Sequence, residues 1–232
     1  MTSKKAGAKL RKITNQSEIN IDGQLLPINT GNGEYYCYVE PLESIKRELD
    51  TMLLHHNKVF IFRLDIHVHE YSPTNEPVTN FRRSFVKWLK SHYGMKRVGY
   101  VWCREVETAK KQHYHLLFML DGDKVNRVGE VDPKKRIDSG TYYGIFERIE
   151  HIASIQNLTV SLPTKKPSYM IKRSDLEKGN FTAYDQVFYR SSYLAKERGK
   201  KLKAERANSF STSRIVRPKN KRISWQQNEL FG

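Results

Sequence analysis

Two histidines separated by one residue mark the part of this sequence where metal chemistry is easiest to place. His113 and His115 begin an apolar run that ends near Leu120, and this pattern predicts a β-strand over residues 112–120. Side chains alternate between the faces of a strand, so both imidazoles point to one side and Tyr114 points to the other. Two imidazoles in this arrangement are suited to bind a divalent metal ion.

A carboxylate for such a metal is available on the preceding segment. Residues 98–106 alternate like a second strand, and the polar turn at 108–112 predicts an antiparallel hairpin with the histidine strand. The hairpin places Glu105 or Glu107 beside the two histidines. The sequence leaves the choice between these two glutamates open.

A second histidine pair competes for the metal. His67 and His69 share one face of a predicted strand over 59–69 with Asp65. This pair lacks an apolar continuation and leads directly into a proline-containing turn, so we favour His113 and His115. If the polar faces of the three strands coincide, Asp65 and His67 line the site from the neighbouring strand.

Phenols and an amine are predicted to gather farther along the chain. Tyr189, Tyr193 and Lys196 follow the spacing i, i+4, i+7 in a predicted helix over 181–200, which places them within roughly 60° of one another. The apolar side chains of that helix lie on its opposite side. A phenol is a poor nucleophile at neutral pH, but a metal ion and an ammonium group stabilise its phenolate and a phosphate under attack. The pattern therefore favours phosphoryl transfer.

The His-Tyr-His strand, a glutamate on the preceding strand and the pattern Tyr-x-x-x-Tyr-x-x-Lys together resemble the HUH endonucleases. In particular, the sequence is similar over residues 57–200 to rolling-circle replication initiators of the filamentous-phage (inovirus) and prophage type. The resemblance implies an α+β fold with a central antiparallel sheet of about five strands and flanking helices. It also implies a bound Mg²⁺ or Mn²⁺ ion and nicking of a specific single strand of origin DNA.

The same resemblance assigns roles to individual residues. The metal ligands would be His113, His115 and Glu105, the nucleophile Tyr193, the second nucleophile Tyr189, and the lysine of the motif Lys196. Attack would form a 5′-phosphotyrosine link, release a free 3′-OH for replication and later rejoin the strands. One departure is Tyr114, which stands where the family prefers an aliphatic residue.

The charge of the chain agrees with a polyanionic partner. Its 232 residues include 41 lysines and arginines against 25 acidic residues, a formal net charge of +16. Proteins this basic commonly bind nucleic acid. We therefore expect single-stranded or supercoiled origin DNA as the partner, with phosphate contacts from Arg82, Arg83, Lys87 and Arg190. The sequence has no Gly-x-x-x-x-Gly-Lys-Ser/Thr loop, so unwinding would need a separate host helicase.

Three segments are predicted. Residues 1–33 would be a mobile basic segment, residues 34–200 the nuclease-like domain, and residues 201–232 a basic tail. Helices are expected over 41–56, 79–93, 141–155 and 181–200, with short strands at 35–39 and 158–162 and a strand or basic loop at 165–172. The alternation of strands and helices predicts an α+β fold.

Location and alternative functions follow from what the sequence lacks. It has no signal peptide and no apolar stretch long enough to span a bilayer, which predicts a protein of the bacterial host cytoplasm without a membrane partner. Two cysteines exclude a disulfide framework. The main alternatives are a DNA-binding regulator without catalysis, and a relaxase or transposase that uses the same chemistry.

Overall fold

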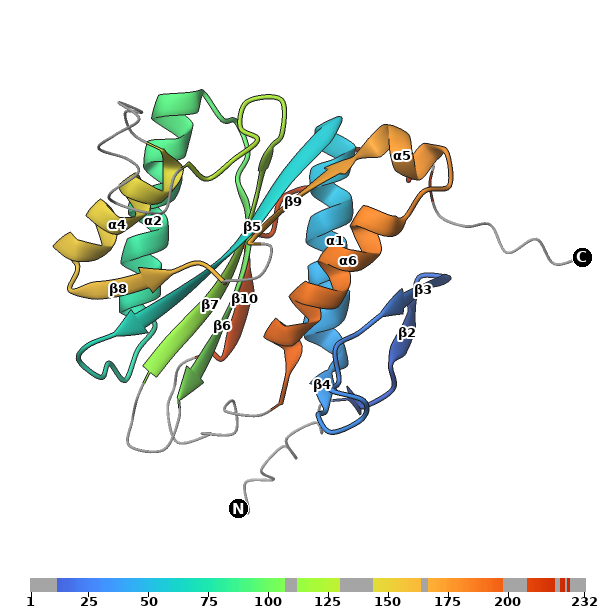
Figure 1. Ribbon diagram of the computed structural model, residues 1–232, viewed down its shortest axis with the longest axis horizontal. Helices are drawn as coiled ribbons and strands as arrows, with labels where there is room; N and C mark the ends of the chain where they lie inside the picture. The colour runs from blue at the N-terminus through green and yellow to red at the C-terminus, as the bar shows by residue number, and fades with distance from the viewer. Residues whose placement is uncertain are drawn as a thin grey trace, which may run out of the picture.

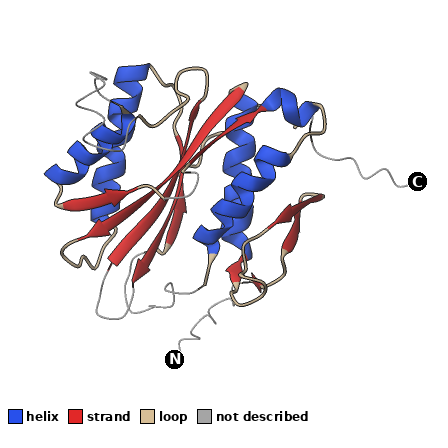
Figure 2. Ribbon diagram, in the orientation of Figure 1, coloured by secondary structure: helices blue, strands red, loops and turns tan. Residues whose placement is uncertain are grey.

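An antiparallel sheet of six strands forms the centre of the fold (Figures 1 and 2). The computed structural model describes residues 12–106, 112–129, 144–163, 167–197, 208–219, 222–223 and 225. The strands of this sheet are β5 (Lys58–Val68), β6 (Gly99–Val106), β7 (Gln112–Asp121), β8 (Leu158–Ser161), β9 (Ser168–Lys172) and β10 (Phe210–Thr212). Their order is β10-β6-β7-β5-β8, and β9 pairs with the other half of the same edge of β5. The α+β prediction is confirmed, with one strand more than the five expected.

Helices cover both faces of the sheet (Figure 1). Helices α1 (Val39–His55) and α6 (Thr182–Ser191) lie on one face, and α2 (Glu76–Tyr93) and α4 (Ile145–Ile155) lie on the other. Alternate side chains of the central strands enter the two cores: Leu117 and Met119 pack on the α1 side, and Leu116 and Phe118 pack on the α2 side. Because β7 is covered on both faces, its second half is a continuous apolar run.

Proline explains two early helix starts. Helix α1 begins at Val39, two residues before its predicted start at Pro41. Helix α2 begins at Glu76, three residues before its predicted start at residue 79, and has a proline in its first turn. Proline is well tolerated in the first turn, where its missing N–H has no partner to lose. Helix α2 ends at Gly94, whose φ of 59° is the left-handed conformation expected of a C-terminal glycine.

The predicted helix over 181–200 is wrong for residues 192–197, and residues 198–200 lie outside the described part of the chain. Helix α6 ends there, a 3₁₀ turn η2 (Ser192–Ala195) follows, and Lys196 is extended. Lys196 forms an antiparallel bridge with Cys37, and the N–H of Glu197 donates to the carbonyl of Tyr36 at 2.8 Å. This pairing with a distant segment, which helical spacing cannot reveal, replaces the last predicted turns. A short helix, α5 (Arg173–Glu177), was also not predicted.

The N-terminal prediction fails for the residues that the structure describes. Within 12–33, strands β1 (Ile13–Thr14), β2 (Glu18–Ile21) and β3 (Gln24–Pro27) form, and β4 (Cys37–Tyr38) pairs with β1. Strands β2 and β3 make a hairpin whose turn residues, Asp22 and Gly23, both have positive φ. Leu26 and Ile28 are buried in the core on the α1 side. An Asp-Gly pair between alternating residues is a hairpin signal, so this element was predictable.

The C-terminal segment is not simply a tail. Strand β10 pairs with β6 and completes that edge of the sheet. Beyond it, the carboxylate of buried Glu48 on α1 accepts hydrogen bonds from the Ser213 hydroxyl and the Arg214 N–H. The prediction of a basic tail over 201–232 is therefore wrong for residues 208–214, which are part of the folded domain. Residues 1–11 and 141–143, where a mobile start and a helix cap were expected, lie outside the described residues.

A buried polar group joins α1 to α6. Lys46 Nζ lies 2.7 Å from Asp50 Oδ2, and their side chains are only 1% and 8% exposed. The Tyr184 hydroxyl donates to Asp50 Oδ1 at 2.8 Å. Contacts with Lys46 and Tyr184 thus replace the water that the Asp50 carboxylate loses on burial.

We expect Lys46→Met to lower the free energy of unfolding by about 3 kcal/mol, because it leaves the Asp50 charge buried without its cation. The control is Lys58→Met, which breaks an ion pair with Asp123 whose side chains are 45% and 50% exposed. This control should cost less than about 1 kcal/mol. Urea denaturation of both variants measures the difference, and equal losses would contradict the prediction.

Candidate metal centre and its tyrosine

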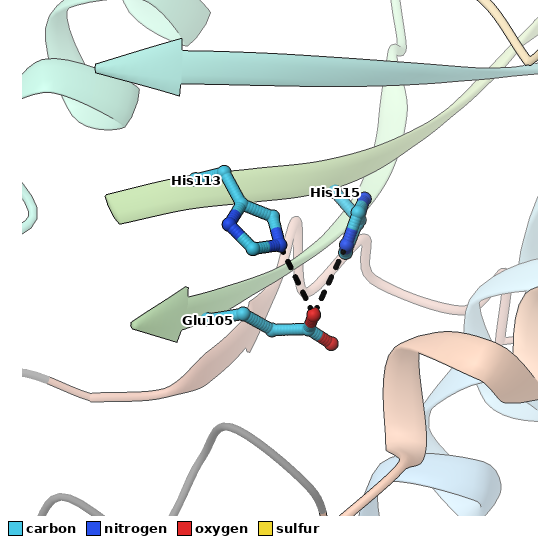
Figure 3. Close-up of side chains that lie close together, drawn as sticks. All are labelled: Glu105, His113 and His115. Carbon is cyan, nitrogen blue, oxygen red and sulfur yellow. Dashed lines mark hydrogen bonds and ion pairs between the residues drawn. The ribbon is translucent and has the colours of Figure 1, made fainter. Parts of the chain in front are cut away.

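Glu105, His113 and His115 converge on one point of the sheet face (Figure 3). Glu105 on β6 is directly opposite His113 on β7, so the antiparallel register brings the two side chains together. Glu105 Oε2 lies 3.1 Å from His113 Nε2 and 3.3 Å from His115 Nε2. Glu105 and His115 are buried, and His113 is partly exposed. The structure therefore brings together the three residues predicted as ligands.

The donor set fits a divalent metal ion. The ligand atoms of the three residues all lie within 4.8 Å of one another. Two imidazole nitrogens and one carboxylate oxygen, without a thiolate, suit metals of the Mn²⁺ class better than thiolate-seeking ions. Glu107, the alternative carboxylate, lies outside the described residues.

Asp65 on β5 orients His115 from behind. Its Oδ1 lies 2.6 Å from His115 Nδ1, and Arg63 donates to both carboxylate oxygens of Asp65. Arg63 Nη2 also lies 2.9 Å from His115 Nδ1. Arg63 can only donate, so it could bond this nitrogen only in its unprotonated form, whereas Asp65 can only accept from the protonated form. The shorter contact with the anionic Asp65 favours a proton on Nδ1. With Nδ1 protonated, the lone pair of His115 Nε2 faces Glu105 and a metal.

The same contacts shift two pKa values. Burial by itself would lower the pKa of His115, but hydrogen bonds to Asp65 and Glu105 outweigh it and raise that pKa above its usual value. Burial by itself would raise the pKa of Asp65, but the hydrogen bond to His115 and the Arg63 charge lower it. A proton on His115 therefore competes with a metal ion.

The rival histidine pair does not converge on a point. The His67 ring stacks on the His113 ring at a centroid distance of 5.8 Å, whereas His69 Nε2 lies 2.8 Å from the Thr159 hydroxyl on β8. His67 and Asp65 thus line the site from β5, as the alternation of that strand predicted.

Tyr193 in the 3₁₀ turn η2 packs directly on the triad. Its ring meets the His115 ring edge to face, with centroids 5.2 Å apart. The Arg63 guanidinium lies 4.6 Å and Lys196 Nζ 4.3 Å from the centre of the Tyr193 ring. Burial, followed by the Glu105 charge, raises the pKa of the Tyr193 phenol. Tyr193 is thus a protonated phenol next to two cations and a set of metal-binding groups.

Lys196 is held between two aromatic rings. Its Nζ lies 3.7 Å from the centre of the Tyr35 ring, on a segment that pairs with residues 196–197. Sequence reasoning missed Tyr35 and Arg63. The alternation of β5 placed Arg63 beside Asp65 and was a usable signal, whereas no local pattern connects Tyr35 with Lys196.

The other predicted residues do not join the triad itself in the part of the chain that the structure describes, although Arg190 lines a small pocket with Arg63 and Leu117. The Tyr189 side chain is 42% exposed on α6, and among the described residues the structure does not place it against the triad. Arg190 on α6 is exposed. Arg82, Arg83 and Lys87 are on α2, which covers the opposite face of the sheet. Of the predicted catalytic residues, Tyr193 is therefore the one that packs on a metal-binding group, and Lys196 lies beside the Tyr193 ring.

Residues 25–213 match the family described as the YagK/YfjJ C-terminal domain, and the chain belongs to this family. The match extends from β3 through β10 and so includes the triad, Tyr193 and Lys196. Neither the curated proteins nor the solved structures contain a match to this chain. Among the residues that the structure describes, none of the helices combines the length and apolar character needed to cross a bilayer.

We expect His113→Ala and Glu105→Gln each to weaken Mn²⁺ binding by more than about tenfold, because each removes a ligand. His67→Ala is the matched control, since it removes a neighbouring imidazole that stacks on His113, and should change the affinity by less than about threefold. Calorimetric titration with Mn²⁺ measures these affinities. Loss of binding in His67→Ala but not in His113→Ala would show that the ligands are assigned wrongly.

The raised pKa of His115 predicts the sign of a pH effect. Only the neutral imidazole binds metal, so Mn²⁺ affinity should fall as the pH drops through this pKa, by up to about tenfold per pH unit, and should level off above it. Asp65→Asn removes a hydrogen bond that raises the pKa and should move the fall to lower pH. Titrations between about pH 5 and 8 test both statements, and a flat profile would contradict them.

Proposed function

We propose that this chain is a metal-dependent endonuclease of the HUH type, which nicks single-stranded DNA through Tyr193. The observation that carries the proposal is the packing of the Tyr193 ring on His115, within the Glu105–His113–His115 cluster and beside Lys196. Metal-binding groups alone would fit many hydrolases and oxygenases. A phenol between two cations at such a cluster is what attack on a phosphodiester requires.

The reaction is a transfer between oxygens. The Tyr193 Oη atom bonds to the phosphorus of the DNA backbone, and the bond from phosphorus to the 3′ oxygen breaks. The phenol proton is lost and the departing 3′ oxygen gains one, so the products are a 5′-phosphotyrosine and a free 3′-OH. Reversal with a second 3′-OH rejoins the strand without a high-energy cofactor.

The residues around Tyr193 serve different parts of this step. Lys196 and Arg63 offset the negative charge that develops on the phenolate, which burial and Glu105 otherwise disfavour. Asp65 keeps the neutral His115 ring in the tautomer and orientation needed for ligation. A bound Mg²⁺ or Mn²⁺ ion would polarise the scissile phosphate. Tyr189, exposed one helical turn away, is assigned to the second strand transfer.

The substrate and biological role complete the proposal. A net charge of +16 supports a DNA substrate. The role proposed is initiation of rolling-circle replication on single-stranded or supercoiled origin DNA in a bacterial cytoplasm, with a separate host helicase. Relaxase and transposase roles share the nick and the covalent link, so the first experiment concerns the chemistry.

We expect a covalent adduct when the protein and Mn²⁺ are mixed with single-stranded oligonucleotides of randomised central sequence. A label at the 3′ end should stay with the protein after denaturation, and a label at the 5′ end should be released, because the link is to the 5′ phosphate. Tyr193→Phe should lower adduct formation by more than about a thousandfold, since it removes the attacking oxygen.

Tyr189→Phe is the matched control for this experiment, because it removes a phenol from the same helical segment. It should still form the first adduct and lose only the second attack, in which Tyr189 opens another strand. An adduct of equal yield in Tyr193→Phe, or retention of the 5′ label, would overturn the proposed mechanism. Binding of DNA without adduct formation by any oligonucleotide in the pool would instead support a regulator without catalysis.

A further inference from the structure

A groove of about 670 Å³ opens at the sheet edge that β10 completes. One wall is the exposed side of α2, and the other is the chain at 213–219 that follows β10. Val98 and Tyr100, at the start of β6, line it between these walls. The groove is therefore at the opposite end of β6 from Glu105.

Basic side chains dominate this groove. Six of them line it: Arg82, Lys90, Lys96, Arg97, Arg217 and Lys219. All except Arg82 are exposed, and none of the described residues that line the groove is acidic. A shallower depression on α2 shares Arg82 and Lys90 and adds Arg83 and Lys87. The two form one continuous positive surface, which attracts a polyanion.

The wall at 213–219 is held in place by the fold. The Ser213 N–H donates to the Tyr100 carbonyl at 2.9 Å, and Glu48 accepts hydrogen bonds from Ser213 and Arg214. Farther along, His55 Nε2 lies 2.9 Å from the Val216 carbonyl oxygen. Arg217 and Lys219 therefore extend from a backbone that is tied to both β6 and α1.

The aromatic groups of the groove are already engaged. Arg82 donates to the Tyr100 hydroxyl at 2.7 Å, and its guanidinium lies over the ring at 4.6 Å. The His55 imidazole contacts the Val216 carbonyl. Proteins that hold single strands generally offer aromatic faces for stacking, whereas contacts to a duplex backbone need only positive charge. We infer that this groove binds the phosphate backbone of duplex DNA.

The inference deepens the proposed function and depends on it for the choice of DNA as the polyanion. Glu105 in the triad comes five positions after Tyr100 of the groove along β6, a rise of about 17 Å at about 3.3 Å per residue. That length corresponds to roughly five phosphates along one DNA strand. Because Tyr100 faces the α2 side of the sheet and Glu105 faces the α1 side, the DNA would pass around the β10 edge. The substrate is thus a single strand that is nicked at the triad and continues into a duplex at least about five nucleotides away.

The test uses the full chain without metal, so that nicking does not contribute. We expect Arg97→Ala combined with Lys219→Ala to weaken binding of a short random-sequence duplex by at least about fivefold near 0.1 M salt. The slope of log affinity against log salt should fall by about two units, one for each lost phosphate contact. The control combines Lys172→Ala with Lys178→Ala, two exposed lysines near α5, and should leave both quantities unchanged.

Each outcome has a defined meaning. Equal duplex affinity and salt slope in the groove variant and the parent would overturn the inference. A loss seen only with a single strand of the same length, or only with anionic phosphatidylserine vesicles, would also overturn it, by assigning the groove to a different polyanion. Thermal unfolding confirms that the variants are folded. Because no adduct is measured here, a failure of the Tyr193 chemistry would leave the duplex-binding result unchanged. A failure of duplex binding in the groove would likewise leave the adduct experiment unchanged.

Discussion

The site depends on the pairing of three antiparallel strands in one register. Glu105 is opposite His113 across β6 and β7, and Asp65 is opposite His115 across β7 and β5. A shift of one residue in either pairing would turn these side chains to the other face of the sheet. The apolar halves of the same strands prevent that shift, because they are buried on both faces. The hydrophobic core thus determines the geometry of the polar site.

A second constraint is the meeting of two distant chain segments. Residues 36–37 pair with residues 196–197, and the Asn29 N–H donates to the Ser192 hydroxyl at 2.8 Å. These contacts end the helical conformation after α6, so Tyr193 sits in a tighter turn than an α-helix provides. They also place Tyr35 against Lys196. Long-range pairing therefore positions the Tyr193 phenol and the Lys196 amine at the site. Helical spacing in the sequence predicted their positions only in part.

Much of the sheet was predictable from the sequence because alternation is a local property. The three central strands, the hairpin that joins β6 to β7, and the meeting of His113 and His115 with a glutamate at 105 or 107 follow from periods of two residues. The period alone did not decide between the two glutamates. Strand β10 has three residues, and its position depends on β6 and Glu48. The contact of Tyr35 with Lys196 is equally nonlocal. The β2–β3 hairpin is a local feature, and its Asp-Gly turn is a signal in the sequence. The polar composition of residues 1–33 nevertheless predicted a mobile segment there.

The bridge between Cys37 and Lys196 has a consequence for how the protein acquires its chemistry during synthesis. The triad lies within residues 105–115, so its hairpin can form when about half of the chain has been made. Tyr193 arrives much later, and its placement needs contacts that span more than 160 residues. Nascent chains and fragments that end before Tyr193 would therefore carry the triad without the Tyr193 ring packed against it. Under the mechanism proposed above, the protein would become able to cleave DNA only when its fold is complete.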